Sequence, residues 1–479
     1  MTKLKRYYIT TPIYYVNDKP HIGHAYTTIA GDILARYYKS QGASVFYLTG
    51  TDEHGSKVAE SADKASMSPQ EFADQQAELF KAAWSNLNIK YDYFIRTTDK
   101  RHRESVTKFM QQLQDNQAVY EGKYQGLYCT GCEKFFTEKE LVDGLCPYHK
   151  EPPKQITEKN YFFKLKDHLE EIKKLIESDQ VNIRPLAQKN ETLGLFKQGL
   201  EDFSISREKV KWGIPLPFDQ AQNVYVWVDA LQNYISAIGY GDNEEEFKKW
   251  WQEAEVIHLM ARDILKFHAI FWPAMLLANG IKTPDRQYIH GFFSINGQKM
   301  SKSLGNIIDP NEMVQEFGTD ATRYLLLSQF PFGADGNIDQ SNFIAKYNTD
   351  LANGLGNLVA RTLNMIEKFS EGQIPETVES TRDFAKVNKY TEELAFDKAL
   401  SEIWSQIAWA NIEIDKQKPW DLAKAGQKEK LNKILSQLAT LLCEIGQAIS
   451  PFMPETGNKI LKQISAKKIE KGESLFARK

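Results

Sequence analysis

The sequence predicts an α/β protein in which a split, doubly wound parallel sheet carries an insertion and is followed by an all-α bundle. Residues 7–10 and 45–49 are rich in strand-forming side chains and flank a helical pattern over 23–39, which gives the β-α-β opening of a parallel sheet. Between about 119 and 188 this pattern breaks into short β-like pieces with clustered cysteines, which indicates an insertion. Long helical patterns predict an antiparallel bundle near the end of the chain, over 350–369, 382–417 and 427–449.

Further elements complete the predicted sheet. The apolar residues of 23–39 keep a period of about 3.6 residues, and Gly42 follows as a stop signal. The apolar stretch 263–277 predicts a helix that Pro273 kinks. Asn296-Gly297 predicts a tight hairpin turn after the last strand. Strand-like composition returns after the insertion, and we expect three more strands, over 224–228, 255–259 and 288–293.

The composition is that of a soluble globular protein. A length of 479 residues is enough for about three domains. Hydrophobic residues make up 42% and charged residues 26%, no stretch approaches the roughly 18 apolar residues of a membrane span, and the basic start lacks the apolar region of a signal peptide. A net charge of −3 argues against nonspecific coating of nucleic acid, so any such site must be local. We expect a cytoplasmic protein.

The segment His21-Ile22-Gly23-His24 stands where the first predicted helix begins. Unpaired N–H groups and the helix dipole favour anions there, and Gly23 lets a flat base approach the backbone. The pattern therefore favours a phosphate site. For this segment alone, a metal half-site or plain polar surface are the alternatives.

A second segment, Lys299-Met300-Ser301-Lys302-Ser303, follows the predicted hairpin turn. Lysines on a mobile loop suit the charge that develops on a polyphosphate, whereas a solvated basic loop is the alternative for this segment alone. Together and in this order, the two segments resemble the HIGH and KMSKS motifs of class I aminoacyl-tRNA synthetases. The resemblance implies a Rossmann-like catalytic fold in which His21, His24, Lys299 and Lys302 are catalytic. It also implies an ATP site made of His21, Gly23, His24, Lys299, Met300, Ser301 and Lys302.

Four other segments resemble the methionyl-tRNA synthetase family in particular, over 10–15, 51–55, 225–230 and 267–268. The resemblance covers essentially the whole chain. By position it implies a methionine site made of Pro12, Ile13, Tyr15, Asp52, Trp227, Ala230, Tyr234, Ile264 and His268. An unbranched, polarisable thioether gains about 0.3–1.5 kcal/mol from an aromatic edge, which a branched aliphatic side chain cannot copy. The resemblance also implies that Asp52 holds the substrate ammonium and that Arg207 pairs with Asp52.

Cysteine is sparse, and three of the four cysteines lie close together in the chain. Cys129 and Cys132, followed by Cys146 and His149, form two pairs with metal-ligand spacing, while incidental cysteines beside a surface histidine are the alternative. Four protein ligands leave no open position for water, so the spacing predicts a structural zinc ion. Cys443 stands apart among apolar helical residues and is expected in the core.

Two segments of the predicted bundle match positions that read the CAU anticodon in methionyl enzymes. Asn357 and Arg361 share one helical face, and Trp420 at a helix start can stack on an unpaired base for about 1–3 kcal/mol. The resemblance therefore implies that these three residues bind the anticodon. Without it, they would pass for a bundle surface and a core tryptophan.

The resemblance implies five regions along the chain. They are the first half of the catalytic domain over 1–118, a connective insertion with a zinc knuckle over 119–220, the second half with the KMSKS loop over 221–320, a stem-contact connector over 321–346, and the helical anticodon-binding domain over 347–479. The implied enzyme is a methionine–tRNA ligase that uses L-methionine, ATP with Mg²⁺, and tRNA(Met). A sister class I synthetase for another amino acid, or a noncatalytic tRNA-binding paralogue, are the alternatives.

Two departures from the family pattern matter. Residues 260–263 read Met-Ala-Arg-Asp, where many members have Gly-Lys before the aspartate, so the adenine contacts are left unassigned. The extra C-terminal domain through which some members dimerise has no counterpart before Lys479, so a monomer is expected.

Overall fold

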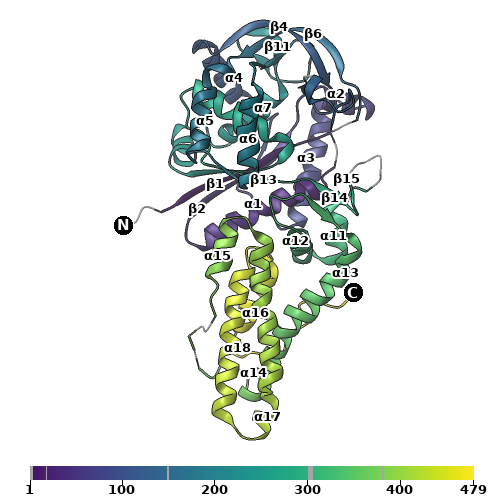
Figure 1. The fold of residues 1–479 in the computed structure, drawn as a ribbon. Helices are drawn as coiled ribbons and strands as arrows, with labels where there is room; N and C mark the ends of the chain where they lie inside the picture. Colours follow the sequence, from purple (N-terminus) through teal and green to yellow (C-terminus); the bar gives the residue numbers. More distant parts are fainter. Residues whose placement is uncertain are drawn as a thin grey trace. The chain divides into compact units, whose positions relative to one another are not determined.

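The computed structural model describes residues 4–17, 19–136, 138–147, 150–299, 306–376, 378–379 and 382–479. The chain divides into two compact units (Figure 1). We call residues 1–20, 38–85 and 90–290 the sheet unit, and residues 21–37, 86–89 and 291–479 the helical unit. In the part of the chain that the structure describes, none of the helices is both long and apolar enough to cross a membrane.

A six-stranded parallel sheet forms the centre of the sheet unit, and it confirms the predicted fold class. Its strand order is β3, β2, β1, β12, β13, β7, and every neighbouring pair runs parallel. Tyr8, Leu48 and Ile257 are fully buried, as expected for a sheet that is covered on both faces. β1 pairs with β12, which the chain reaches only after the insertion, so the sheet is split in sequence. The strands are β1 Arg6–Tyr15, β2 Ser44–Asp52, β3 Tyr93–Arg96, β7 Asn182–Arg184, β12 Glu255–Ala261 and β13 Arg286–His290.

Helices and two antiparallel sheets complete the sheet unit (Figure 1). The helices are α2 Ser56–Lys64, α3 Pro69–Asn86, α4 Lys100–Asp115, α5 Leu169–Glu177, α6 Leu186–Gln198, α7 Val226–Leu231, α8 Asn233–Ser236, α9 Glu244–Phe247 and α10 Trp272–Ala278. One antiparallel sheet has the order β5, β4, β6, β8, with β4 Val119–Cys129, β5 Lys134–Phe136, β6 Lys154–Phe163 and β8 Phe203–Ser204. The other has the order β10, β11, β9, with β9 Ser206–Arg207, β10 Pro215–Leu216 and β11 Asp219–Val224.

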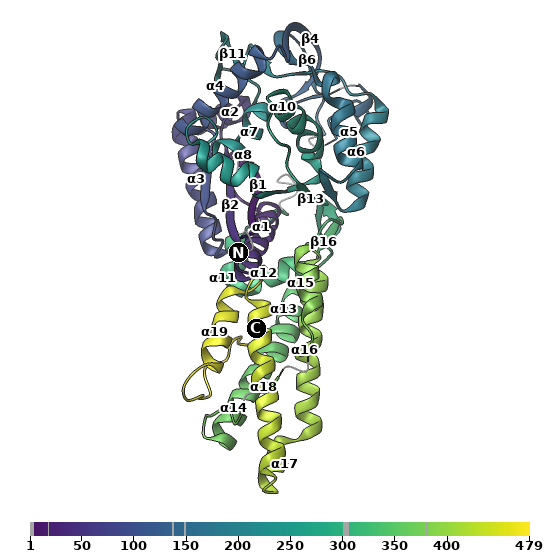
Figure 2. The ribbon, with the colours of Figure 1, turned by 90° about the vertical axis from the view of Figure 1, so that its left-hand side faces the viewer.

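The helical unit combines the first helix of the chain with its C-terminal bundle. Residues up to Tyr37 of α1 Ile22–Ser40 belong to it. A small sheet of β14 Phe293–Ile295, β15 Gln298–Lys299 and β16 Gly336–Ile338 precedes the bundle, in which α14, α16 and α18 pack along one another (Figure 2). The helices that follow α1 in this unit are α11 Pro310–Phe317, α12 Thr319–Leu327, α13 Phe343–Lys346, a π-helix Tyr347–Gly356, α14 Asn357–Ser370, α15 Ala385–Glu392, α16 Phe396–Gln417, α17 Pro419–Lys424, α18 Lys428–Ile449 and α19 Pro454–Ile464.

A buried ion pair holds α1 inside the helical unit. Asp32 of α1 and Arg323 of α12 are both fully buried, and Arg323 Nη2 donates to Asp32 Oδ2 at 2.7 Å. Arg323 also donates to the backbone carbonyls of Leu87, Pro451 and Phe452. The arginine therefore joins four separate segments of the chain, and each of its three guanidinium nitrogens donates at least one hydrogen bond.

The structure corrects the prediction of one long helix over 382–417. Two helices stand there, α15 and α16, because Leu394 adopts a left-handed backbone conformation with φ 55°. Leu394 is 1% exposed, so its burial outweighs the helical preference of the surrounding sequence. Cys443 is only half-buried, which corrects its expected place in the core, and Gln447 Nε2 lies 3.7 Å from its sulfur.

Two other predicted elements differ in the sheet unit. The strand over 224–228 is wrong, because β11 ends at Val224 and α7 begins at Val226. Val226 and Val228 are buried in the core from this short helix, so packing outweighs their strand preference. The predicted helix over 263–277 contains a π-helical turn, Phe267–Phe271, directly before α10. Pro273 stands in the first turn of α10, where its missing N–H is tolerated.

Candidate functional site

An unpartnered carboxylate oxygen lies at the end of β2. β1 and β2 pair with a register shift between Thr10 and Ile13, where Pro12 cannot donate to the ladder. The shift places Tyr15 opposite Asp52, which is 8% exposed. Asp52 Oδ1 has no hydrogen-bond partner among the described residues. Burial, together with the nearby Asp229, Glu53 and Glu133 carboxylates, raises the pKa of Asp52 well above its ordinary value. A buried carboxylate of this kind is suited to bind a cationic ligand group.

Tyr234 and His268 form a neutral polar contact close to two of the predicted methionine residues. His268 Nδ1 donates to the carbonyl of Ile264 at 3.0 Å, so His268 Nε2 accepts from the Tyr234 hydroxyl at 2.7 Å. Burial lowers the pKa of His268 to about 4, which keeps the imidazole neutral at pH 7. This pair therefore adds no charge next to Ile264.

Aromatic and aliphatic side chains cluster around this pair. Trp227 stacks on Phe267 with ring centroids 4.4 Å apart, and Tyr234 lies against His258 at 4.2 Å. Tyr234 belongs to the hydrophobic core of the sheet unit, and Ala230 and His268 are buried as well. Four further predicted residues are half-buried and pack against that core, namely Ile13, Tyr15, Trp227 and Ile264, while Pro12 is half-buried.

Glu133 is a residue that the sequence reasoning missed. It is 3% exposed, and its carboxylate accepts from Lys57 N at 2.9 Å, from the Tyr128 hydroxyl, and from the Tyr15 hydroxyl at 3.5 Å. Its backbone has φ 48°, and its carbonyl accepts from Tyr225. The only signal for Glu133 in the sequence is that it directly follows Cys132.

The expected pairing of Arg207 with Asp52 is wrong, because Arg207 pairs with Glu158 instead. Its guanidinium makes a bidentate ion pair with Glu158, with Nε to Oε2 at 2.9 Å and Nη2 to Oε1 at 3.2 Å. It also lies over the Tyr128 ring, 4.1 Å from Cζ to the ring centroid. Glu158 is 3% exposed on β6, and a buried carboxylate on a neighbouring strand takes both donors of the fork.

The three clustered cysteines come together as predicted. Their sulfur atoms lie within 4.8 Å of one another, and Cys132 Sγ is 3.8 Å from Cys146 Sγ. Tetrahedral Zn–S bonds of 2.3 Å require about 3.8 Å between sulfurs, so Cys129, Cys132 and Cys146 fit a zinc ion. Burial and the Cys129 thiol raise the pKa of Cys132, so metal binding here releases a proton. His149 lies outside the described residues.

His21 and His24 stand at the start of α1, inside the helical unit. Their rings stack with centroids 3.7 Å apart. His21 Nδ1 accepts from Gly23 N at 3.1 Å, and His24 Nδ1 accepts from His21 N at 3.3 Å, so each ring carries its proton on Nε2. Burial lowers the pKa of His21 to about 4. The pKa of His24 is lowered well below its ordinary value by burial and by the neighbouring His21 ring. Both imidazoles are neutral N–H donors at pH 7.

The predicted hairpin turn is present in the same unit. β14 and β15 pair antiparallel around Asn296 and Gly297, whose φ values are 51° and 78°. Tyr26 of α1 contacts Phe293 of β14 at 4.7 Å, and Ile22 N donates to the Ile308 carbonyl at 3.1 Å. The start of α1 therefore contacts the chain on both sides of residues 300–305. Met300, Ser301, Lys302 and the side chain of Lys299 lie outside the described residues.

The three predicted anticodon residues lie close together in the bundle. Asn357 and Arg361 are on α14, and Trp420 is on α17, with Arg361 Cζ 5.9 Å from the Trp420 ring centroid. Trp420 is half-buried, which argues against a core role. Asn357 is exposed and donates to Asn411, and Arg361 pairs with Asp415. The arrangement offers an amide, a guanidinium and an indole on one surface.

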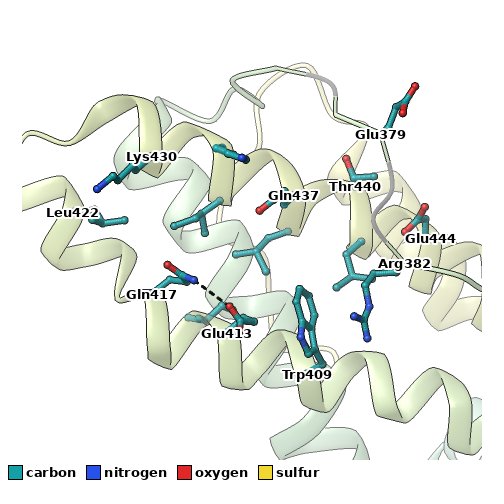
Figure 3. Close-up of a pocket in the computed structure, with 15 residues that line it drawn as sticks. Glu379, Arg382, Trp409, Glu413, Gln417, Leu422, Lys430, Gln437, Thr440 and Glu444 are labelled. Atoms are coloured by element: carbon teal, nitrogen blue, oxygen red, sulfur yellow. Dashed lines mark hydrogen bonds between the residues drawn. The ribbon is translucent and has the colours of Figure 1, made fainter.

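A separate cavity of about 490 Å³ lies between α16, α17 and α18 (Figure 3). Arg382 lies over the Trp409 ring, with Cζ 4.4 Å from the ring centroid. The cavity is lined by three cationic side chains and three carboxylates, so the lining has no net charge that would attract phosphate. Asn357, Arg361 and Trp420 are not among the described residues that line it. The charged lining residues are Arg382, Lys430, Lys433, Glu379, Glu413 and Glu444.

Comparisons with known proteins point in one direction. The family model described as tRNA synthetases class I (M) matches residues 7–156 and 148–363. The methionine–tRNA ligase of Caldanaerobacter subterraneus is 46% identical over 96% of this chain and 74% of its own length, and that of Rickettsia felis is 42% identical over 97% and 93%. The solved methionyl-tRNA synthetase of Mycobacterium tuberculosis bound by methionyl-adenylate superposes with a TM-score of 0.93 at 34% identity, covering 99% of this chain and 100% of that one.

Proposed function

The chain belongs to the methionine–tRNA ligase family of class I tRNA synthetases, and on that premise we propose how its own residues perform the reaction. The enzyme activates L-methionine with ATP to methionyl-adenylate and then transfers the methionyl group to tRNA(Met). The observation that supports this assignment best is the unpartnered oxygen of buried Asp52 beside a neutral aromatic wall.

Methionine binds through its two ends. Its ammonium group pairs with Asp52, whose buried oxygen has no partner among the described residues. Its thioether contacts the aromatic and aliphatic residues, where the hydroxyl of Tyr234 is held by neutral His268. An aromatic edge stabilises sulfur by about 0.3–1.5 kcal/mol. The remaining predicted methionine residues are Pro12, Ile13, Tyr15, Trp227, Ala230 and Ile264.

Activation needs no general base, because an α-carboxylate with a pKa of about 3.5 is already ionised at pH 7. That carboxylate attacks the α-phosphorus of ATP, an oxygen–phosphorus bond forms, and pyrophosphate leaves with the electron pair of the broken bond. His21 and His24 donate hydrogen bonds from Nε2 to phosphate oxygens, while Lys299 and Lys302 stabilise the pyrophosphate charge. Mg²⁺ bound with ATP supplies further positive charge at these oxygens.

Transfer to tRNA is the second step. The 2′-hydroxyl of the terminal adenosine attacks the methionyl carbonyl and gives up its proton, while AMP leaves with the electrons of the broken carbon–oxygen bond. Asn357, Arg361 and Trp420 recognise the anticodon by hydrogen bonding and by stacking on an unpaired base.

The three cysteines, with His149 as fourth ligand, hold a structural zinc ion. A cytoplasmic location and a monomeric state complete the proposal.

ATP–pyrophosphate exchange without tRNA tests the assignment. We expect exchange that depends on methionine. Exchange with isoleucine, valine, leucine or cysteine instead would identify a sister synthetase, and no exchange with any amino acid would point to a noncatalytic tRNA-binding protein. Charging of tRNA(Met) with labelled methionine then tests the second step.

A further inference from the structure

A buried chain of hydrogen bonds joins three elements of the sheet unit. His54 Nδ1 lies 2.6 Å from Asp229 Oδ2, and His102 Nε2 lies 2.7 Å from Asp229 Oδ1. His102 Nδ1 lies 2.8 Å from Ser236 Oγ. The exposed fraction is 4% for His54 and zero for the other three residues. Since an ionised carboxylate only accepts hydrogen bonds, each imidazole donates one N–H to Asp229.

The network connects the two ends of the proposed methionine site. His54 stands two residues after Asp52, which would bind the ammonium group. Asp229 is on α7 between Trp227 and Ala230, which would line the side-chain pocket. Each oxygen of one carboxylate is thus held by a different histidine, one next to the ammonium carboxylate and one on α4. Burial would raise the pKa of Asp229, but the two imidazoles lower it to about 2, so the Asp229 carboxylate is ionised at pH 7.

The segment that carries His54 is fixed on its other sides. Glu53 accepts from Arg96 Nε at 2.7 Å and from Arg96 Nη2 at 2.9 Å. Trp212 Nε1 donates to the Glu53 carbonyl at 2.6 Å, and the His54 ring lies against Trp212 with centroids 5.3 Å apart. The His54 side chain therefore links this fixed segment to α7 through its hydrogen bond to Asp229.

Nucleophilic catalysis does not account for the arrangement. Ser236, His102 and Asp229 are hydrogen-bonded in series, as in a serine hydrolase. All three are fully buried, however, so no substrate carbonyl can reach the Ser236 hydroxyl. A positioning role is the one that this burial permits.

We propose that His54 and His102 are positioning residues for methionine, which act through Asp229 to fix the distance between Asp52 and the helix that carries Trp227 and Ala230. The inference rests on the proposed function and adds residues that never touch the substrate. Loss of either imidazole donor frees one Asp229 oxygen, α7 shifts relative to Asp52, and methionine no longer meets both ends of its site. ATP binding, which is assigned to other residues, is unaffected.

Matched pairs of variants test the proposal. His54→Leu and His102→Leu remove the donors, while His54→Asn keeps a donor at the Nδ1 position and His102→Gln keeps one at the Nε2 position. We expect each leucine variant to raise the KM and the Kd for methionine about tenfold or more, and the KM for ATP less than about twofold. The Asn and Gln variants recover methionine affinity to within about threefold. Exchange kinetics give the KM values, and calorimetry with methionine alone gives the Kd.

Two controls separate positioning from general damage. Val106→Ala lowers stability from the buried face of α4 but leaves both imidazole donors to Asp229 in place, and it should leave the KM for methionine unchanged. Ser236→Ala is a milder change for the case in which a leucine variant fails to fold, and it should raise the KM for methionine severalfold. Normal methionine affinity in folded His54→Leu or in Ser236→Ala would overturn the proposal, as would leucine and amide variants that behave alike. A wild-type enzyme without methionine-dependent exchange would instead refute the proposed function.

Discussion

Replacing Trp420 with alanine separates tRNA recognition from amino-acid activation. Trp420 is half-buried and its ring faces the Arg361 guanidinium at 5.9 Å, so part of the indole is available to a base. One stacked base contributes about 1–3 kcal/mol, which is roughly a tenfold to hundredfold change in binding. A fully buried tryptophan would cost about 3–5 kcal/mol of stability on truncation, and half burial reduces this to about 2 kcal/mol. We therefore expect Trp420→Ala to charge tRNA(Met) at least tenfold less efficiently at subsaturating tRNA, with methionine-dependent exchange nearly intact.

The assay uses two tRNAs, one with the wild-type anticodon and one with an altered anticodon, well below the melting temperature of the variant. Wild-type enzyme should discriminate strongly between them, and Trp420→Ala should lose part of that discrimination. Urea unfolding of both proteins measures the free energy of unfolding. Equal discrimination by the two enzymes, with charging lost only as the variant unfolds, would show that Trp420 merely fills the bundle.

Four further changes test other parts of the structure. Asp52→Asn should raise the KM for methionine about tenfold to hundredfold, because a hydrogen bond to a charged group contributes about 1.5–3 kcal/mol. In the wild type, the raised pKa of Asp52 means that methionine affinity falls on acidification at a higher pH than for an ordinary aspartate; a pH profile identical in the Asn variant would contradict this. Lys302→Ala should slow adenylate formation by orders of magnitude in single-turnover experiments and leave the Kd for methionine almost unchanged, and the reverse pattern would show that its assigned role is wrong. Cys129→Ser should reduce bound zinc in elemental analysis, whereas wild-type protein without zinc would exclude the metal site. Arg323→Met removes the buried guanidinium from Asp32 and from three backbone carbonyls while Arg36 still pairs with Asp32, so the free energy of unfolding should fall by about 1.5–3 kcal/mol in a urea titration, and an unchanged value would show that the pair is not stabilising.

Local signals predicted the elements that depend on local interactions. β1, α1 and β2 stand where strand composition and helical period placed them, and the Asn296-Gly297 turn has both residues in the left-handed region that a primed hairpin requires. The cysteine cluster was also predictable, because its spacing is itself the chemical signal. The five regional boundaries and the roles of the site residues stay predictions.

Long-range contacts explain what the sequence did not reveal. His54 and Asp229 are 175 residues apart, and no periodicity links them. Arg207 pairs with Glu158 because the two strands that carry these residues are neighbours in space. A resemblance carried over position by position does not show such neighbours. Val226 and Val228 are helical because this conformation buries both side chains in the core. In each case burial, rather than local preference, decided the outcome.

The pairing of Asp32 with Arg323 also sets an order of events during synthesis. The two residues are 291 positions apart, so at about 5–20 residues per second a ribosome needs roughly 15 seconds to a minute to supply the arginine after the aspartate. During that interval Arg36, one helical turn along α1, has already been synthesised and can pair with Asp32. In the final structure Arg36 Nε lies 2.7 Å from Asp32 Oδ2. The carbonyls of Pro451 and Phe452 arrive later still. α1 is therefore among the first helices translated, but its buried ion pair can form only after α12 has been made.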